Sequence, residues 1–242
     1  MQGKSEALRI KLFADGANID GMIEMSQNPK ISGLTTNPTL MRKAGIENYE
    51  KFANDVLKEI TEKPISFEVF SDDFDEMIQQ ALKISSWGEN VYVKVPITNS
   101  KGASTNSVYK FLSDKKVKLN ITALMTEGQV QDVVSGLNPH VSSYVSVFAG
   151  RIADTGRNPV PIMQNCLRLM SVNPNLELIW ASPRELLNVF QADEINCHII
   201  TATNDILGKL NLIGRDLIEY SLETVKMFRD DALLANYDIN QN

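Results

Sequence analysis

The stretch VYVKVPIT, residues 91–98, has the alternating pattern of a β-strand with one charged residue inside it. Val91, Val93 and Val95 share one face, on which they can pack beneath a layer of helices, and Pro96 closes the run. Lys94 then lies on the opposite face, in a strand that is otherwise apolar. Because a buried ammonium is costly unless it is paired or loses its proton, this lysine is a candidate functional group.

Strand-like runs of this kind alternate with amphipathic helical stretches along the whole chain. The other runs are 9–16, 31–36, 65–71, 119–124, 143–150, 176–182 and 195–201, and the helical stretches are 49–61, 74–87, 127–137, 161–170 and 183–192. Eight strand-then-helix units in 242 residues predict an α/β fold of the closed (β/α)8 type, a TIM barrel. An open doubly wound sheet is the alternative, but ADGANIDG (14–21) lacks the glycine fingerprint that usually follows its first strand.

The organisation of the chain favours one domain over residues 1–242, because no linker rich in Pro, Gly or Ser divides it. A helical extension is predicted at about 214–237, after the eighth strand. Its apolar residues lie largely on one side, so we expect it to cover its own barrel or that of a neighbouring copy. These residues are Leu217, Ile218, Leu222, Val225, Met227 and Phe228.

Composition excludes several classes of function. A net charge of −6 without a basic run makes the chain a poor nucleic-acid binder, and no common nucleotide-binding motif is present. The two histidines show no metal-ligand spacing, so no metal is expected. The polar start MQGKSEA has no signal-peptide character and no apolar run is long enough to span a membrane. Together with two distant cysteines, Cys166 and Cys197, this predicts a reduced, cytoplasmic protein.

Polar residues recur near the C-terminal ends of the predicted strands. Barrel strands turn alternate side chains into the lumen, and active sites of such barrels lie at the C-terminal face. The polar residues near these ends are Asp15, Thr35, Asn37, Glu68, Lys94, Asn120, Thr122, Ser146 and Ser182.

Each of these residues also has an explanation without chemistry. Asp15 and Asn37 precede helical stretches and suit helix N-caps. Glu68 and Lys94 suit a buried ion pair, which is weak evidence of function. Their convergence on one mouth of the barrel favours a site over a series of unrelated structural roles.

The set favours Schiff-base chemistry. A mostly apolar lumen favours the neutral amine of a lysine, which attacks a carbonyl carbon to form a Schiff base. Glu68 and Thr122 can relay protons through water while the carbinolamine dehydrates. Asp15 can act as the base when a neighbouring carbon–carbon bond breaks.

A phosphate site is predicted after the sixth and seventh strands. Arg151 and Arg184 flank this region together with Ser182, and two placed arginines in an acidic chain suit a phosphate group. The alternative is that the two arginines are solvated surface cations, which would not bind a phosphate.

Seven motifs together resemble the transaldolase and fructose-6-phosphate aldolase family of class I aldolases. The resemblance covers about residues 11–210 and keeps the family's order, and the pairing of TTNP with VKVP is quite specific. The motifs are FADG (13–16), GLTTNPTL (33–40), FEVF (67–70), VYVKVPIT, LNITAL (119–124), SVFAGRIADTG (146–156) and WASPR (180–184).

The resemblance implies catalytic roles for four residues. Lys94 matches the family's Schiff-base lysine, Asp15 its acid/base aspartate, and Thr122 the threonine that holds the catalytic water. Glu68 stands where transaldolases have glutamate and fructose-6-phosphate aldolases tend to have glutamine.

The resemblance also implies substrate-binding roles. Asn37 and Asn120 match the asparagines that hold the dihydroxyacetone hydroxyls, with Thr35 on the same floor and Ser146 at another polar position. Phe148 stands where transaldolases have phenylalanine and the aldolases have tyrosine.

The phosphate clamp of the family corresponds to Arg151, Ser182 and Arg184. Here the motifs depart from the common S-P-F-V-G-R and S-F-R patterns, since the chain has SVFAGR and SPR. Pro183 lies next to Arg184 and is expected to shift that arginine relative to the family's clamp.

The resemblance therefore implies a transaldolase that carries a dihydroxyacetone unit between sugar phosphates without a metal or organic cofactor. A fructose-6-phosphate aldolase that releases free dihydroxyacetone is the alternative, and the short chain favours it. A non-catalytic sugar-phosphate sensor is a further alternative, which the complete set of Lys94, Asp15 and Glu68 opposes. A homo-oligomer is expected, as in the family's small members.

Overall fold

The centre of the molecule is a closed barrel of eight strands in the order β1 to β8, each hydrogen-bonded in parallel to its neighbours. The structure is a computed structural model that describes residues 8–239. The predicted (β/α)8 barrel is confirmed. The strands are β1 (Lys11–Asp15), β2 (Ile31–Thr35), β3 (Ile65–Glu68), β4 (Val91–Pro96), β5 (Leu119–Leu124), β6 (Ser143–Val147), β7 (Leu176–Trp180) and β8 (Ile199–Thr203).

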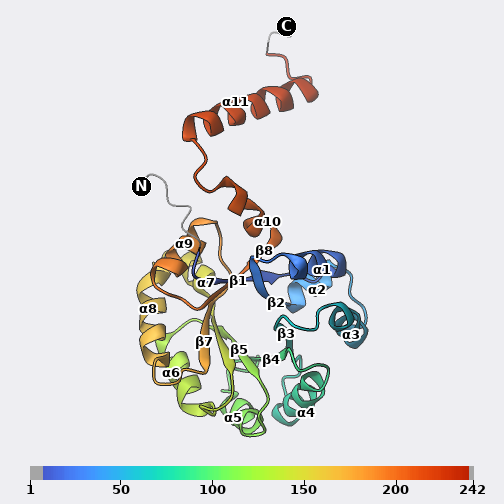
Figure 1. Cartoon of the computed structure of the whole chain (residues 1–242), viewed down its shortest axis with the longest axis vertical. Helices are drawn as coiled ribbons and strands as arrows, with labels where there is room; N and C mark the ends of the chain where they lie inside the picture. The colour runs from blue at the N-terminus through green and yellow to red at the C-terminus, as the bar shows by residue number, and fades with distance from the viewer. Residues whose placement is uncertain (1–7, 240–242) are drawn as a thin grey trace. The chain divides into compact units, whose positions relative to one another are not determined.

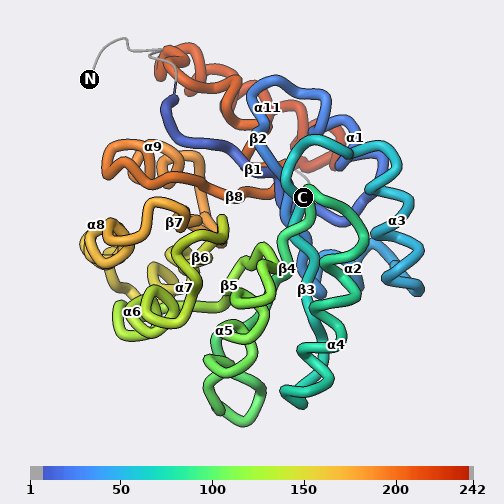
Figure 2. The backbone as a smooth tube through the Cα atoms, turned by 60° about the horizontal axis from the view of Figure 1, so that its bottom comes forward, coloured from blue at the N-terminus to red at the C-terminus, as the bar shows by residue number. Residues whose placement is uncertain are grey.

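Helices surround these strands (Figures 1 and 2). Their apolar faces cover the outer face of the barrel, on which Val91, Val93 and Val95 are almost completely buried as the alternation of β4 predicts. The helices are α1 (Ile19–Gln27), α2 (Pro38–Lys43), α3 (Tyr49–Glu59), α4 (Phe74–Ser85), α5 (Asn106–Asp114), α6 (Glu127–Gly136), α7 (Ala149–Asp154), α8 (Pro159–Met170), α9 (Leu187–Glu194) and α10 (Asn204–Leu207).

Aromatic rings fill the lumen below the strand ends. Tyr92 stacks on Tyr144 with ring centroids 4.0 Å apart, and the ring of Phe13 meets Tyr144 edge-on at 5.7 Å. A Cβ on Gly33 would lie 2.5 Å from the ring of Phe13, so this position of β2 leaves room for the ring only as glycine. Phe13, Tyr92 and Tyr144 each lie two residues before a predicted site residue and therefore form a floor beneath it.

Some predicted boundaries are wrong, and turn geometry explains them. The eighth strand begins at Ile199 rather than at residue 195, because Asn196 has a positive φ of 58° and holds a turn. Helix α9 begins at Leu187 rather than at residue 183. Ser182 has a φ of 61°, and Asn188 Oδ1 accepts hydrogen bonds from the backbone N–H groups that follow Pro183.

Within the described residues, 209–239 belong to a second compact unit, separate from the unit Leu8–Gly208. It contains α11 (Leu217–Leu234), which confirms the predicted helical extension, and a 3-10 turn (Gly208–Leu212) links the two units. The six apolar side chains predicted on this helix are at least half exposed. One domain over residues 1–242 stays a prediction. No helix within residues 8–239 is long and apolar enough to cross a membrane.

Candidate active site

A cavity of about 520 Å³ opens at the C-terminal ends of the strands. All twelve residues predicted for the site line it, and they come from every strand or following segment except the eighth. Such a volume is ordinary for a small-molecule site. The predicted residues are Asp15, Thr35, Asn37, Glu68, Lys94, Asn120, Thr122, Ser146, Phe148, Arg151, Ser182 and Arg184.

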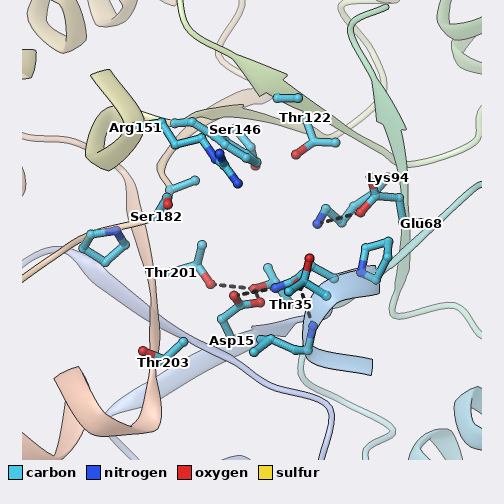
Figure 3. Close-up of a pocket in the computed structure, with 18 of the residues that line it drawn as sticks. Asp15, Thr35, Glu68, Lys94, Thr122, Ser146, Arg151, Ser182, Thr201 and Thr203 are labelled. Carbon is cyan, nitrogen blue, oxygen red and sulfur yellow. Dashed lines mark hydrogen bonds and ion pairs between the residues drawn. The ribbon is translucent and has the colours of Figure 1, made fainter. Parts of the chain in front are cut away.

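Lys94 projects from β4 into this cavity and is only 7% exposed. Its Nζ lies 3.1 Å from Glu68 Oε2 (Figure 3). The same nitrogen donates a hydrogen bond to the carbonyl of Thr36 at 2.8 Å. The register of β3 and β4 pairs Glu68 with Lys94, which explains why the two side chains meet. The expectation that Lys94 has mostly apolar surroundings is therefore wrong, because its amine is held by a carboxylate and a backbone carbonyl.

Asp15 ends β1 with both carboxylate oxygens occupied. Thr35 Oγ1 donates to Oδ1 at 2.8 Å and Asn37 Nδ2 donates to Oδ2 at 3.0 Å. Burial raises the pKa of Asp15, and the positive charge of Lys94 with these two hydrogen bonds partly opposes the rise. A carboxylate with a raised pKa is a stronger proton acceptor once ionised.

The helix-cap explanation fails for Asp15 and holds for Asn37. Asn18, not Asp15, caps α1 by accepting from the N–H of Gly21. Asn37 caps α2 through Oδ1, which accepts from the N–H of Leu40 at 2.9 Å. The cap fixes the side-chain amide and directs its Nδ2 to Asp15, so one asparagine serves both structure and site.

Thr201 on β8 also lines the cavity, although it was not among the residues predicted from the sequence. Its Oγ1 lies 2.6 Å from Thr35 Oγ1 (Figure 3). Because the one hydroxyl proton of Thr35 goes to Asp15, Thr201 must be the donor in this pair. The predicted run 195–201 had Thr201 as its last residue, and β8 continues to Thr203, which places Thr201 inside the strand.

A second polar chain crosses the lumen on β3, β5 and β6. Ser146 Oγ donates to Asn120 Oδ1 at 2.7 Å, and Asn120 Nδ2 donates to Ser66 Oγ at 3.0 Å. Ser66 was not predicted as a site residue. Thr122 differs, since its buried hydroxyl lines the cavity and has no hydrogen-bond partner within residues 8–239. A buried hydroxyl of this kind suits a bound water or a substrate atom.

Cationic side chains lie across the cavity from Lys94, where Figure 3 shows Arg151 beside Ser182. Arg151 follows β6 on α7, makes no ion pair with a described residue, and places its guanidinium 5.8 Å from the ring centroid of Phe148. Such an arginine is free to meet an anion.

Arg184 is already paired. Its Nε donates to Asp154 Oδ1 at 2.8 Å, its Nη2 also bonds this carboxylate, and its Nη1 donates to Ser182 Oγ at 3.0 Å. These hydrogen bonds hold the pKa of Asp154 below its usual range. Although the SPR motif departs from the family's pattern at Pro183, Arg184 still lines the cavity. Asp154 neutralises part of the charge of Arg184.

Residues 8–239 contain no group of three or more His, Cys, Asp or Glu side chains arranged to hold a metal ion.

Cys166 and Cys197 are both buried free thiols, and burial raises the pKa of each to about 12. Such thiols are protonated and unreactive at neutral pH.

The model of the family named transaldolase/fructose-6-phosphate aldolase matches residues 12–241. The chain belongs to this family. It is therefore related to enzymes of sugar-phosphate metabolism, as the seven motifs indicated.

Individual relatives agree with the family. A probable transaldolase from Thermoanaerobacter sp. (strain X514) is 32% identical over 221 residues, covering 90% of this chain and 95% of that protein. A probable transaldolase from Clostridioides difficile (strain 630) is 31% identical over 202 residues, covering 83% and 89% of the two chains. One from Streptococcus equi subsp. zooepidemicus (strain MGCS10565) is 29% identical over 226 residues, covering 92% and 97%.

Solved structures of distant sequence share the fold. Tryptophan synthase subunit alpha from Campylobacter jejuni aligns with a TM-score of 0.55 at 13% identity, covering 84% of this chain and 91% of that chain. A HpcH/HpaI aldolase/citrate lyase family protein from Burkholderia cenocepacia J2315 aligns with a TM-score of 0.57 at 11% identity, covering 91% and 96%. These likenesses concern the barrel alone.

Proposed function

We propose that the protein is a transaldolase that moves a dihydroxyacetone unit from a ketose phosphate to an aldose phosphate through a Schiff base on Lys94. One observation carries the proposal. The same cavity holds the Lys94 amine beside a carboxylate, the carboxylate of Asp15, and an arginine across from both.

The first chemical stage forms the Schiff base. Glu68, 3.1 Å from the lysine nitrogen, is placed to take one of its protons and leave a neutral amine. The amine attacks the C2 carbonyl of fructose 6-phosphate, and the resulting carbinolamine loses its hydroxyl as water. This loss needs a proton, which Glu68 can return through a water held by Thr122.

The second stage breaks the bond between C3 and C4. Asp15 takes the proton of the C4 hydroxyl, and C4 and its oxygen form the carbonyl group of an aldehyde. The electrons of the C3–C4 bond move into the iminium to give an enamine. Glyceraldehyde 3-phosphate leaves, and an acceptor such as erythrose 4-phosphate enters. The steps then run in reverse to give sedoheptulose 7-phosphate.

Substrate recognition would follow the polar chains of the cavity. Asn37 and Asn120 would bind the hydroxyl groups of the dihydroxyacetone unit, with Asn37 oriented by Asp15 and Asn120 oriented by Ser146. Thr35 would line the same floor. Arg151 would bind the phosphate, with Ser182 and Arg184 beside it.

Transfer rather than simple cleavage is favoured by Glu68, by Phe148 and by the relatives. The short length of the chain is compatible with transfer, because the chain covers 95% of a relative that is named a probable transaldolase. Measurement of both rates on one preparation tests the proposal: transfer from fructose 6-phosphate to erythrose 4-phosphate, and release of free dihydroxyacetone. Transfer should be much faster, and equal rates would make the protein an aldolase.

We also infer a homo-oligomer in which a second copy of the chain covers the apolar side chains of α11. Support comes from the exposure of Leu217, Ile218 and Phe228, which are 79%, 81% and 63% exposed. Surfaces of this kind are typical of interfaces. Sedimentation velocity should give a mass of several chains, and replacing Val225 and Phe228 by lysine should reduce it.

A further inference from the structure

The hydrogen-bond ladder between β2 and β3 opens beside Lys94. Thr35 pairs with Ser66 in this ladder, and the N–H of Thr36 donates to the Ser66 carbonyl at 3.2 Å. In a parallel ladder the next bond would run from the N–H of Glu68 to the carbonyl of Thr36. That bond is replaced by two others.

Each of the two freed groups has a side chain as its partner. The Thr36 carbonyl accepts from Lys94 Nζ at 2.8 Å. The N–H of Glu68 donates to the hydroxyl of Tyr49 at 2.7 Å, and the same hydroxyl donates to the Glu68 carbonyl at 3.1 Å. Tyr49 thus binds both backbone groups that Glu68 would otherwise turn toward β2.

The ring of Tyr49 is firmly held. Tyr49 is the first residue of α3, and its ring centroid lies 4.6 Å from that of Phe70, 5.7 Å from that of Trp87 and 6.2 Å from that of Phe67. All three contacts are edge-on. Tyr49 does not line the cavity, so its hydroxyl acts on the site through Glu68 and Thr36.

We propose that Tyr49 is a positioning residue for the Schiff-base lysine; this inference rests on the proposed function of Lys94. By replacing β2 as the partner of Glu68, the Tyr49 hydroxyl keeps the Thr36 carbonyl available to the lysine amine. The same hydroxyl fixes the backbone of Glu68, whose carboxylate lies on the other side of that amine. Tyr49 therefore sets the position of the nucleophile from both directions.

Removal of the hydroxyl has a specific consequence. In Tyr49→Phe, the N–H of Glu68 loses its acceptor inside the fold, and the nearest acceptor that completes the ladder is the Thr36 carbonyl. Closing this bond removes the carbonyl from Lys94. The fold is retained because the N–H of Glu68 and the carbonyl of Thr36 then pair with each other and only the Glu68 carbonyl loses its donor. The lysine nitrogen leaves its position.

The test compares Tyr49→Phe with Tyr109→Phe. Tyr109 is fully buried and its hydroxyl has no partner within the described residues, so the control removes the same atom without removing a hydrogen bond. The rate of borohydride-trapped adduct formation with fructose 6-phosphate should fall about 10- to 100-fold in Tyr49→Phe, as expected for a small displacement of a reacting group. The dissociation constant for inorganic phosphate should not change, and Tyr109→Phe should match wild type.

A crystal structure of Tyr49→Phe separates this inference from the proposed function. It should show Glu68 N hydrogen-bonded to Thr36 O and Lys94 Nζ displaced from that carbonyl, even if wild type forms no adduct with any ketose phosphate. Incorporation of 3,5-difluorotyrosine at position 49, which weakens the hydroxyl as an acceptor and keeps the ring, should slow adduct formation less but in the same direction. Wild-type adduct formation in Tyr49→Phe, an unmoved lysine, or an equal loss in Tyr109→Phe would overturn the inference.

Discussion

Gly150 packs so closely on Ser182 that a Cβ at position 150 would lie 1.5 Å from the Ser182 carbonyl oxygen. The N–H of Gly150 also donates to the Ala181 carbonyl at 3.3 Å. The segment after β6, which carries Arg151, is therefore joined to the segment after β7 with no space for a side chain between them. The close approach requires glycine at this position.

Replacement of Gly150 by alanine should separate the two segments and move Arg151 from Ser182. We expect the KM for phosphorylated sugars to rise and the free energy of unfolding to fall by about 1–3 kcal/mol, as for overpacking of a core. Gly128→Ala is the control, because a Cβ there meets no atom within 4 Å. It should stabilise the protein by up to about 1 kcal/mol. Unchanged kinetics and stability in Gly150→Ala would show that the segments separate without consequence.

Arg151 should contribute more to phosphate binding than Arg184, because Asp154 already neutralises part of the charge of Arg184. Arg151→Ala should raise the KM for fructose 6-phosphate by about tenfold to a hundredfold, the value of one charge-assisted hydrogen bond. Arg184→Ala should raise it less. The KM for unphosphorylated ketoses is the control and should change little. A similar loss on both kinds of substrate would make Arg151 a structural residue.

Asp15→Asn should make the protein more stable and less active. Burial raises the pKa of Asp15 above 3.8, so keeping the carboxylate ionised in the fold costs free energy at neutral pH. This cost is absent well below pH 3.8 and reaches its full size above the raised pKa. The neutral amide should therefore stabilise the fold more at pH 8 than at pH 4. An asparagine keeps both contacts if its oxygen faces Asn37 and its nitrogen faces Thr35.

The same substitution should slow bond cleavage by about 10²–10⁴-fold, as expected for loss of a general base, while adduct formation continues. Urea unfolding at the two pH values and the steady-state rate with fructose 6-phosphate measure both effects. An unchanged rate, or a less stable protein at pH 8, would show that Asp15 has a different role.

Phe148→Tyr should favour release over transfer. The ring of Phe148 lines the cavity, packs on the lumen cluster and lies beneath the guanidinium of Arg151. An apolar ring offers no hydrogen bond to a water near the enamine, whereas a phenol can hold that water or relay a proton. The variant should release more free dihydroxyacetone and transfer less to erythrose 4-phosphate. The ratio of the two rates is the measurement, and an unchanged ratio would show that residue 148 does not decide the outcome.

The alternation of short strands with helices predicted the barrel, and the alternation of side chains within the strands predicted most of the residues that line its cavity. In β4 the three valines and Lys94 occupy the faces that a period of two requires, and the same parity places Glu68 and Asn120 in the cavity. These inferences succeed because lumen and outer face alternate along every strand.

Contacts made by backbone groups or between distant segments could not be predicted. Nothing in the pattern indicates that the Thr36 carbonyl binds Lys94, since a carbonyl occurs in every residue. Asp154 lies in a quoted motif, but its bond to Arg184 depends on the turn at Ser182. Thr201 was missed although it ended a predicted run, because it joins the cavity through a hydroxyl contact with Thr35 on another strand, which the pattern of β8 alone does not indicate.

The central claim is that Lys94 forms a Schiff base with a ketose phosphate. Borohydride reduction in the presence of fructose 6-phosphate, followed by peptide mass mapping, tests it most directly. A dihydroxyacetone-derived mass should appear on the peptide that bears Lys94. Lys94→Met should abolish both this adduct and turnover while the barrel remains folded by circular dichroism. An adduct on another lysine, or turnover that survives in Lys94→Met, would contradict the account.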